Sequence, residues 1–66
     1  MKGYKIMDYD IYAYNKNNNK ELLVTVNDRN MAEYLLDLLS DLADNKNLRM
    51  KNGEEVNFIS LEIDED

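Results

Sequence analysis

The sequence has no cysteine, histidine, tryptophan or proline, and only two glycines, Gly3 and Gly53, among its 66 residues. Without cysteine and histidine, the chain cannot form a disulfide, and it lacks the usual ligand sets for zinc, iron, copper and haem. Two glycines so far apart cannot build the glycine-rich loops that cradle phosphate in nucleotide-binding proteins. We therefore expect neither a cofactor nor a metal.

Long hydrophobic runs are also missing, since the longest, Ile11 to Tyr14, has four residues. A bilayer-spanning helix needs roughly 20 apolar residues, and the core of a signal peptide needs about 7 to 15. The sequence therefore predicts no membrane association and a cytoplasmic location.

The residues that commonly carry catalysis are scarce. A nucleophilic triad normally needs a histidine base, and the hydroxyls of Ser40, Ser60 and Thr25 lie in no motif that would activate them. Asp8 and Asp10 share one face of a predicted strand, where we interpret them as solvated positions rather than a catalytic pair. We expect a protein that is not an enzyme.

The composition is that of one small, acidic, folded domain. The chain is 44% hydrophobic and carries 14 acidic against 8 basic residues, for a net charge of −6. A chain of this length buries only about 60% of the surface exposed when it is unfolded, so small domains often use a disulfide, a metal or a second subunit. We expect a single domain over 1–63 with an acidic, mobile tail at 64–66, and a homodimer is one way to complete its core.

The first half of the chain predicts a β-hairpin. Apolar and polar residues alternate over 7–14 and again over 21–26, and the asparagine-rich segment 15–20 between them is typical of a turn. A turn centred on Asn17 and Asn18 places the apolar residues of both strands on one face of the sheet. The expected pairs are Ala13 with Leu22, Ile11 with Val24, and Tyr9 with Val26.

A helix follows, beginning after Asn27 or Asp28 as the N-cap and ending near Asn45. Its apolar residues recur at i, i+3, i+4, i+7, i+8 and i+11, which predicts one broad buried face. They are Met31, Tyr34, Leu35, Leu38, Leu39 and Leu42.

A second hairpin is expected to complete the fold, with strands before and after a three-residue loop of Lys51, Asn52 and Gly53. This loop keeps Leu48 and Val56 on one face. Beyond Phe58 the apolar positions shift to Ile59, Leu61 and Ile63, through either a bulge or burial on both sides. The predicted class is α+β, a small antiparallel sheet with one covering helix in the order β-β-α-β-β.

Four acids form one line on the solvent side of the predicted helix, with no lysine or arginine between Arg29 and Lys46. Surface helices usually mix charges, because like charges four residues apart are mildly destabilising, and acids near the helix C-terminus oppose its dipole. Such departures from local rules are typical of functional surfaces, although an acidic face can also serve solubility alone. The residues are Glu33, Asp37, Asp41 and Asp44.

The outer face of the predicted sheet carries Tyr12, Tyr14 and Leu23, an apolar and aromatic patch of the kind found at interfaces. It is a candidate for self-association. Direct binding of nucleic acid there is disfavoured, because Asp8, Asp10 and neighbouring acids would repel phosphate.

In size and charge alone, with no shared motif, the chain is similar to small phage-encoded inhibitors of host defence or nucleic-acid enzymes. We therefore expect a non-catalytic binding protein whose acidic helix face covers a basic, nucleic-acid-handling surface of another protein. The alternative is a structural module that self-associates through the tyrosine-bearing sheet face.

Overall fold

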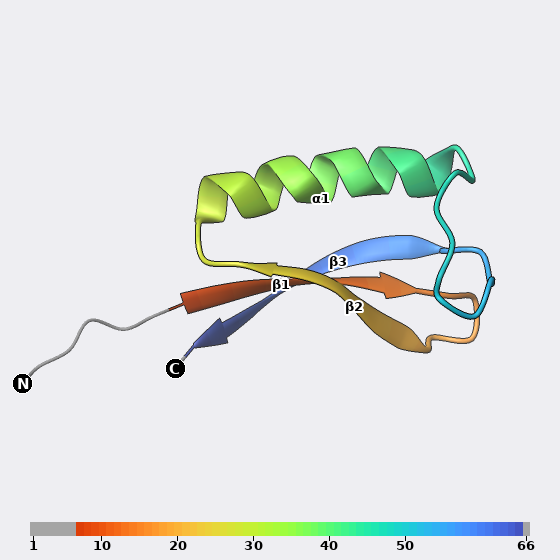
Figure 1. The fold of residues 1–66 in the computed structure, drawn as a ribbon, viewed down its shortest axis with the longest axis horizontal. Helices are drawn as coiled ribbons and strands as arrows, with labels where there is room; N and C mark the ends of the chain where they lie inside the picture. Colours follow the sequence, from red (N-terminus) through yellow and green to blue (C-terminus); the bar gives the residue numbers. More distant parts are fainter. Residues whose placement is uncertain (1–6, 66) are drawn as a thin grey trace, which may run out of the picture.

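The described part of the chain folds into a three-stranded antiparallel sheet with one helix packed on one face. The computed structural model describes residues 7–65, and their side chains through Ile63. The elements are β1 (Met7–Tyr14), β2 (Lys20–Val26), α1 (Arg29–Asp44) and β3 (Phe58–Glu65). Strand β1 is central, in the order β2-β1-β3, and α1 lies along the sheet while the opposite face carries no helix among the described residues (Figure 1). The α+β class is confirmed.

The expected order β-β-α-β-β is wrong, because one strand and not two follows the helix within residues 45–65. The segment before β3 forms a single bridge between Arg49 and Glu55 instead of a pair of strands. Its role is packing, since Met50 and Val56 are buried against Ala13 at one end of the sheet. Strand β3 then pairs with β1 over its whole length, so it is the neighbour of β1 and not the second half of a local hairpin.

The predicted three-residue loop is confirmed, although its flanks are not regular strands. Met50 N–H donates to Glu54 O at 2.9 Å, and Gly53 N–H donates to Met50 O at 2.9 Å. Gly53 has φ of 90°, the left-handed conformation that this loop requires.

The first hairpin uses the same loop. Asn15 N–H donates to Asn19 O at 3.1 Å and Asn18 N–H donates to Asn15 O at 3.0 Å, with Asn18 at φ of 64°. This loop is centred on Asn17, half a residue from the centre expected between Asn17 and Asn18, so the pairing next to the loop differs by one residue from the expected register.

A β-bulge in β2 absorbs this difference. Two of the three predicted pairs are confirmed, Tyr9 with Val26 and Ile11 with Val24. The third is wrong, because the register shifts between Ile11 and Tyr12, so that Ala13 faces Glu21 and Tyr12 faces Leu22. The shift turns Leu22 to the outer face and leaves Leu23 packed against the buried cluster around Ala13.

The apolar residues of β3 beyond Phe58 alternate along the strand, and this alternation places Ile59 and Leu61 on one face of the sheet. Ile59 pairs with Ala13 and Leu61 with Ile11, both on the helix side of the sheet. The strand continues through Asp64 and Glu65, which pair with Asp8 and Met7. The tail expected at 64–66 therefore overlaps the strand, and Asp66 lies outside the described residues.

Helix α1 begins and ends where the sequence predicts. Asp28 is the N-cap, and its carboxylate accepts a hydrogen bond from Met31 N–H at 2.8 Å. At the other end, Asn47 N–H donates to Leu42 O at 2.8 Å and Lys46 N–H to Ala43 O at 3.0 Å, and Lys46 has φ of 60°. These two bonds form a Schellman cap, with lysine where glycine is commonest.

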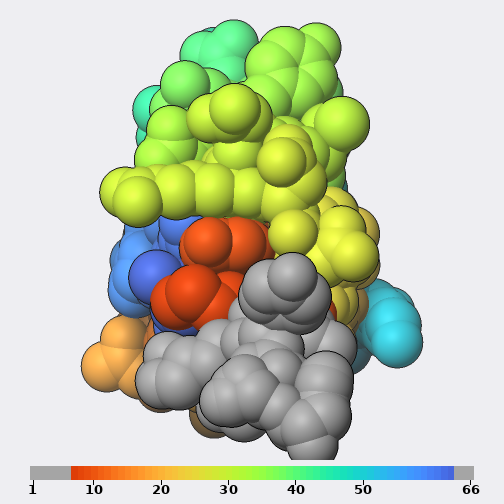
Figure 2. Space-filling model, turned by 90° about the vertical axis from the view of Figure 1, so that its left-hand side faces the viewer, coloured from red at the N-terminus to blue at the C-terminus, as the bar shows by residue number. Residues whose placement is uncertain are grey.

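The helix is rotated relative to the expected buried face. Ala32 and Ala43 are its buried residues, and Leu35, Leu36 and Leu39 are partly buried between them. Alanine has a short side chain, so this face lets the helix lie close to the sheet, as the end-on view shows (Figure 2). Four of the six residues predicted to face the core are exposed instead: Met31, Tyr34, Leu38 and Leu42.

Candidate functional site

The four acids of the helix lie on its exposed side, as the sequence predicts. All are solvent exposed, and their spacing of i, i+4, i+8 and i+11 places them along one side of α1. We call Glu33, Asp37, Asp41 and Asp44 the acidic row.

The charges of the acidic row are balanced at one end only. Arg29 Nε lies 3.1 Å from Glu33 Oε2, one turn along the helix. Within residues 7–63, Asp37, Asp41 and Asp44 form no ion pair, and the last turn of α1 contains no basic residue. The uncompensated charge therefore lies in the C-terminal part of the helix, where the dipole is negative.

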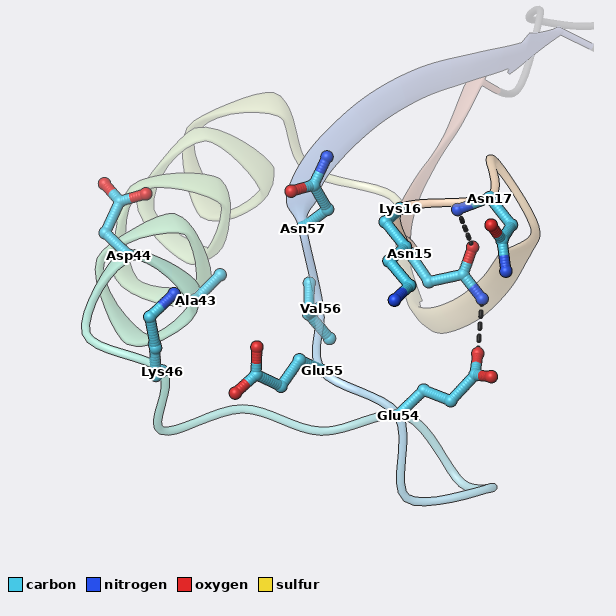
Figure 3. A pocket seen from close by; sticks show the side chains of 10 residues that line it. All are labelled: Asn15, Lys16, Asn17, Ala43, Asp44, Lys46, Glu54, Glu55, Val56 and Asn57. Carbon is cyan, nitrogen blue, oxygen red and sulfur yellow. Dashed lines mark hydrogen bonds between the residues drawn. The ribbon is translucent and has the colours of Figure 1, made fainter.

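A polar pocket of about 570 Å³ continues from the acidic row at the end of the helix. Asp44 lines it together with Glu54 and Glu55, which come from the loop before β3 (Figure 3). Lys16 and Lys46 line it as well. The acidic surface thus extends past the helix, but with both signs of charge present.

Asn15 organises the loop beside this pocket, a role beyond the turn that the sequence predicts for segment 15–20. It is buried, and its Oδ1 accepts hydrogen bonds from Asn17 N–H at 2.9 Å and Asn19 N–H at 3.0 Å. Its Nδ2 donates to Glu54 Oε1, which joins the two three-residue loops (Figure 3). The signal in the sequence is an asparagine at the start of a turn, because its side chain typically accepts hydrogen bonds from backbone N–H groups that follow it.

The exposed apolar residues of α1 form a second line beside the acids. Met31, Tyr34, Leu38 and Leu42 follow at i, i+3, i+7 and i+11 and are 48%, 64%, 46% and 36% exposed. We call these four residues the apolar row. Tyr34 and Leu38 border one shallow hollow together with Asp37, Asp41 and Asp44, so the two rows are adjacent.

The outer face of the sheet carries a third group of apolar side chains. Tyr14 and Phe58 stack with their ring centroids 4.7 Å apart and their planes 3° from parallel. Tyr12 lies beside them, with Lys20 Nζ 4.4 Å from the centre of its ring. The expected third member, Leu23, is wrong because the bulge turns it inward, and Leu22 takes its place opposite Tyr12. We call Tyr12, Tyr14, Leu22 and Phe58 the aromatic face.

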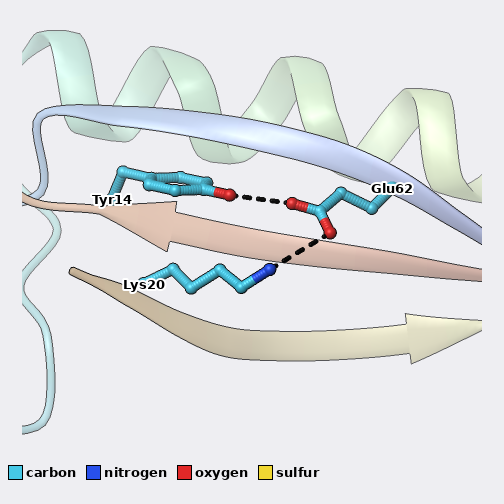
Figure 4. Close-up of polar contacts among 3 residues, drawn as sticks. All are labelled: Tyr14, Lys20 and Glu62. Atoms are coloured by element: carbon cyan, nitrogen blue, oxygen red, sulfur yellow. Dashed lines mark hydrogen bonds and ion pairs between the residues drawn. The ribbon is translucent and has the colours of Figure 1, made fainter. Parts of the chain in front are cut away.

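One polar network spans the three strands on this face (Figure 4). Tyr14 Oη donates to Glu62 Oε2 at 2.8 Å, and Lys20 Nζ lies 3.3 Å from Glu62 Oε1. The hydrogen bond from Tyr14 lowers the pKa of the Glu62 carboxyl, and Lys20 lowers it further. The same contacts with Glu62 raise the pKa of Tyr14 and of Lys20. Glu62 is thus committed to the sheet and does not extend the acidic row.

Two further findings concern metal ions and membranes. Residues 7–63 contain no group of three or more acidic, histidine or cysteine side chains arranged to hold a metal ion. Helix α1 is not long and apolar enough to cross a membrane.

Comparison of the chain with known protein families, with curated proteins and with solved structures gave no match. The function must therefore be argued from the surfaces themselves.

Proposed function

We propose that this chain is a small acidic binding protein without catalytic activity, which inhibits a partner by covering its basic, nucleic-acid-handling surface with the acidic row. The observation that carries the proposal is the run of three aspartates in the C-terminal half of α1, Asp37, Asp41 and Asp44, which form no ion pair within residues 7–63. Each opposes the helix dipole or a neighbouring acid, so the arrangement lowers the stability of the helix. A surface kept at such a cost supports a binding role more than solubility, for which acids elsewhere would serve equally well.

The spacing of the charges makes a match to a nucleic-acid-binding surface depend on acids beyond the row. The acidic row spans roughly 16 Å at about 1.5 Å per residue, which gives one charge per about 5 Å, sparser than the ~3.4 Å of a DNA strand. Glu54 and Glu55 carry the acidic surface past Asp44 at the pocket, where Lys16 and Lys46 also lie and Arg49 is 3.7 Å from Glu55. The row is therefore suited to occupy part of a phosphate-binding surface, in the manner of a DNA mimic or of a phage inhibitor of host defence.

The experiment compares two double variants that remove the same number of charges. Asp37→Asn/Asp41→Asn changes the acidic row, whereas Asp8→Asn/Asp10→Asn changes the outer face of the sheet. The amide oxygen introduced at position 10 can still accept the hydrogen bond from Thr25, which is 2.7 Å long in the native protein. Immobilised protein is exposed to a lysate of its native host at low and high salt, and the retained proteins are identified.

We expect the native chain and the Asp8/Asp10 variant to retain the same basic nucleic-acid-binding protein at low salt and to release it as salt rises. The Asp37/Asp41 variant should retain it at least tenfold less, and the purified partner should lose nucleic-acid binding when the native chain is added. Equal retention by the two variants would contradict the proposal.

A second candidate function is self-association through the aromatic face. The observation that favours it is the exposure of Leu22 and Phe58, at 47% and 44%, on a sheet face that no helix of residues 7–65 covers (Figure 1). Contiguous aromatic and apolar side chains are enriched at interfaces. Sedimentation of the native chain at micromolar concentration tests it.

A further inference from the structure

The apolar row is the feature of α1 that a purely electrostatic interaction leaves unexplained. A single exposed apolar residue is ordinary, but four large ones in one line along the helix form a contiguous patch of the kind that marks an interaction site. All four are at least 36% exposed. They belong to a helix whose core contacts are made by Ala32, Ala43 and the leucines between them.

The position of the apolar row beside the acidic row defines the chemistry of what could cover it. Tyr34 and Leu38 share one shallow hollow with Asp37 and Asp41. A partner seated on the apolar row therefore brings its own flanking groups against carboxylates, which favours lysine or arginine at those positions.

A second copy of the chain is a poor match for this surface. Pairing α1 with α1 would bring two acidic rows close together, and the one basic residue within α1, Arg29, is already paired with Glu33. Like charges across an interface disfavour such a complex. Charge complementarity thus points away from self-association here and toward a basic partner.

The spacing of the apolar row further suggests the form of the partner. Tyr34, Leu38 and Leu42 lie on one ridge of residues four apart, and such a ridge packs into the grooves of another helix with the two axes about 20° or about 50° apart. An amphipathic helix supplies both an apolar ridge and flanking charges in one element.

We propose that α1 binds a basic amphipathic helix of its partner protein, with the apolar row seated against the apolar ridge of that helix and the acidic row against its lysines and arginines. This inference rests on the proposed function and adds the form of the partner segment. It predicts a binding energy that has an apolar part, which high salt does not remove, as well as an electrostatic part that high salt weakens.

The test uses two fluorescent peptides of identical composition. One carries leucines at alternating spacings of three and four residues with lysine at the other positions, so that they form one helical ridge, and the other has the same residues in scrambled order. Binding of each to the full chain is measured by anisotropy at about 0.15 M salt, a concentration that screens distant charges. We expect the native chain to bind the amphipathic peptide at least tenfold more tightly than the scrambled one.

Two pairs of substitutions separate the two rows. Tyr34→Gln/Leu38→Gln should weaken binding of the amphipathic peptide at least tenfold and leave the scrambled peptide unchanged, whereas Asp37→Asn/Asp41→Asn should weaken both. Leu22→Gln, at an equally exposed leucine on the aromatic face, is the control and should change neither. Circular dichroism checks that each variant keeps its helix, which glutamine and asparagine at exposed positions should preserve.

The outcomes distinguish this inference from the proposed function. If Tyr34→Gln/Leu38→Gln binds the amphipathic peptide as the native chain does, the apolar row has no role and the inference is overturned, while an electrostatic inhibitor remains. If Asp37→Asn/Asp41→Asn binds both peptides as tightly as the native chain does, the acidic row has no role. Both the inference and the proposed function are then overturned. A dimer of the native chain that Tyr34→Gln/Leu38→Gln dissociates would assign the apolar row to a second copy and overturn the inference as well.

Discussion

Asn18 and Gly53 occupy the same position in two copies of one loop, and only the second has the residue best suited to it. Both have positive φ, 64° and 90°, and the left-handed conformation costs an ordinary L-residue roughly 1–2 kcal/mol. An added Cβ at Gly53 meets nothing within 4 Å, so a substitution there tests backbone conformation without a steric clash.

We expect Gly53→Ala to lower the free energy of unfolding by about 1–2 kcal/mol, and Asn18→Gly to raise it by about 0.5 kcal/mol because asparagine is only mildly strained there. Urea denaturation measures both. The two changes in the free energy of unfolding need not be equal in size. A Gly53→Ala variant more stable than the native protein would show that the positive φ at this position does not favour glycine.

Asn15 is the residue on which the junction of the two loops depends. Replacing it with alanine leaves the N–H groups of Asn17 and Asn19 without their acceptor and removes the donor to Glu54. We expect Asn15→Ala to cost about 1–3 kcal/mol, the usual penalty for a buried polar group that loses its partner.

Exchanging the amide and the carboxylate between positions 15 and 54 provides the matched control. Asn15→Asp alone keeps the acceptor for the loop but places a second carboxylate against Glu54. Asn15→Asp/Glu54→Gln restores a donor to that contact, so it should recover a large part of the stability lost in Asn15→Asp. Urea denaturation compares the two variants. If the double variant is no more stable than Asn15→Asp, the contact between Asn15 and Glu54 does not link the two loops.

At the scale of the element, acidic side chains have opposite effects on stability at the two ends of α1. Asp28 caps the N-terminus, where a carboxylate is favourable. Asp41 and Asp44 lie near the C-terminus, where the dipole opposes them and the last turn has no basic residue. The helix is thus stabilised by one acid and destabilised by others.

We expect Asp41→Asn/Asp44→Asn to stabilise the protein by about 0.5–1 kcal/mol, a rise in Tm of several degrees for a domain of this size. Asp28→Ala should lower stability by about 1 kcal/mol. Thermal melts followed by circular dichroism at low salt measure both. A loss of stability in the double variant would show that the acids contribute to the fold, and the argument from cost to function would then fail.

The fold could be predicted wherever local chemistry decides it. The ends of α1 follow from Asp28 and from the polar segment after Asp44, and the loop at Gly53 follows from the residue that tolerates positive φ. Register near Tyr9 and Ile11 follows from alternation, which a one-residue slip would invert.

Features that depend on distant contacts could not be predicted in this way. The rotation of α1 is set by Ala32 and Ala43, which let the helix lie close to a sheet too narrow to cover all its leucines. The bulge at Leu23 compensates for a turn whose centre alternation alone does not fix. The site residues of the acidic row were identified by charge spacing, whereas the apolar row became visible only once that rotation was known.

The polar network on the sheet predicts how one contribution to stability depends on pH. Glu62 accepts a hydrogen bond from Tyr14 and pairs with Lys20, and both contacts lower its pKa. A lowered pKa in the folded state means that the stabilisation is present above the ordinary pKa of glutamate and is lost as the pH falls through the lowered value.

We therefore expect NMR titration to give Glu62 a pKa below that of glutamate in a short peptide, about 4.3. Tyr14→Phe should raise it toward that value, because the phenol hydrogen bond is the largest cause of the shift. Phenylalanine keeps the stacking on Phe58, so packing is preserved. An unchanged Glu62 pKa in Tyr14→Phe would assign the shift to Lys20 instead.

At the scale of the whole molecule, the two proposed interactions use opposite faces and respond oppositely to salt. The acidic row attracts a basic partner, and salt weakens that attraction. Self-association through the aromatic face brings together two chains that each carry a net charge of −6, so their mutual repulsion falls as salt screens it. The direction of the salt effect is therefore a means of telling the two functions apart.

For self-association we expect sedimentation of the native chain to give a dimer fraction that grows with concentration in the micromolar range and grows further with added salt. Leu22→Gln/Phe58→Gln should remain monomeric, because it replaces the two most exposed side chains of the aromatic face with polar ones, whereas Tyr34→Gln/Leu38→Gln should dimerise like the native chain. A chain that stays monomeric at every concentration and salt would remove self-association and leave the acidic row as the functional surface. A dimer that dissociates on addition of salt would instead indicate an interface held by ion pairs. The aromatic face would not explain such an interface, because its four side chains are uncharged and the neighbouring Lys20 and Glu62 are already paired within each chain.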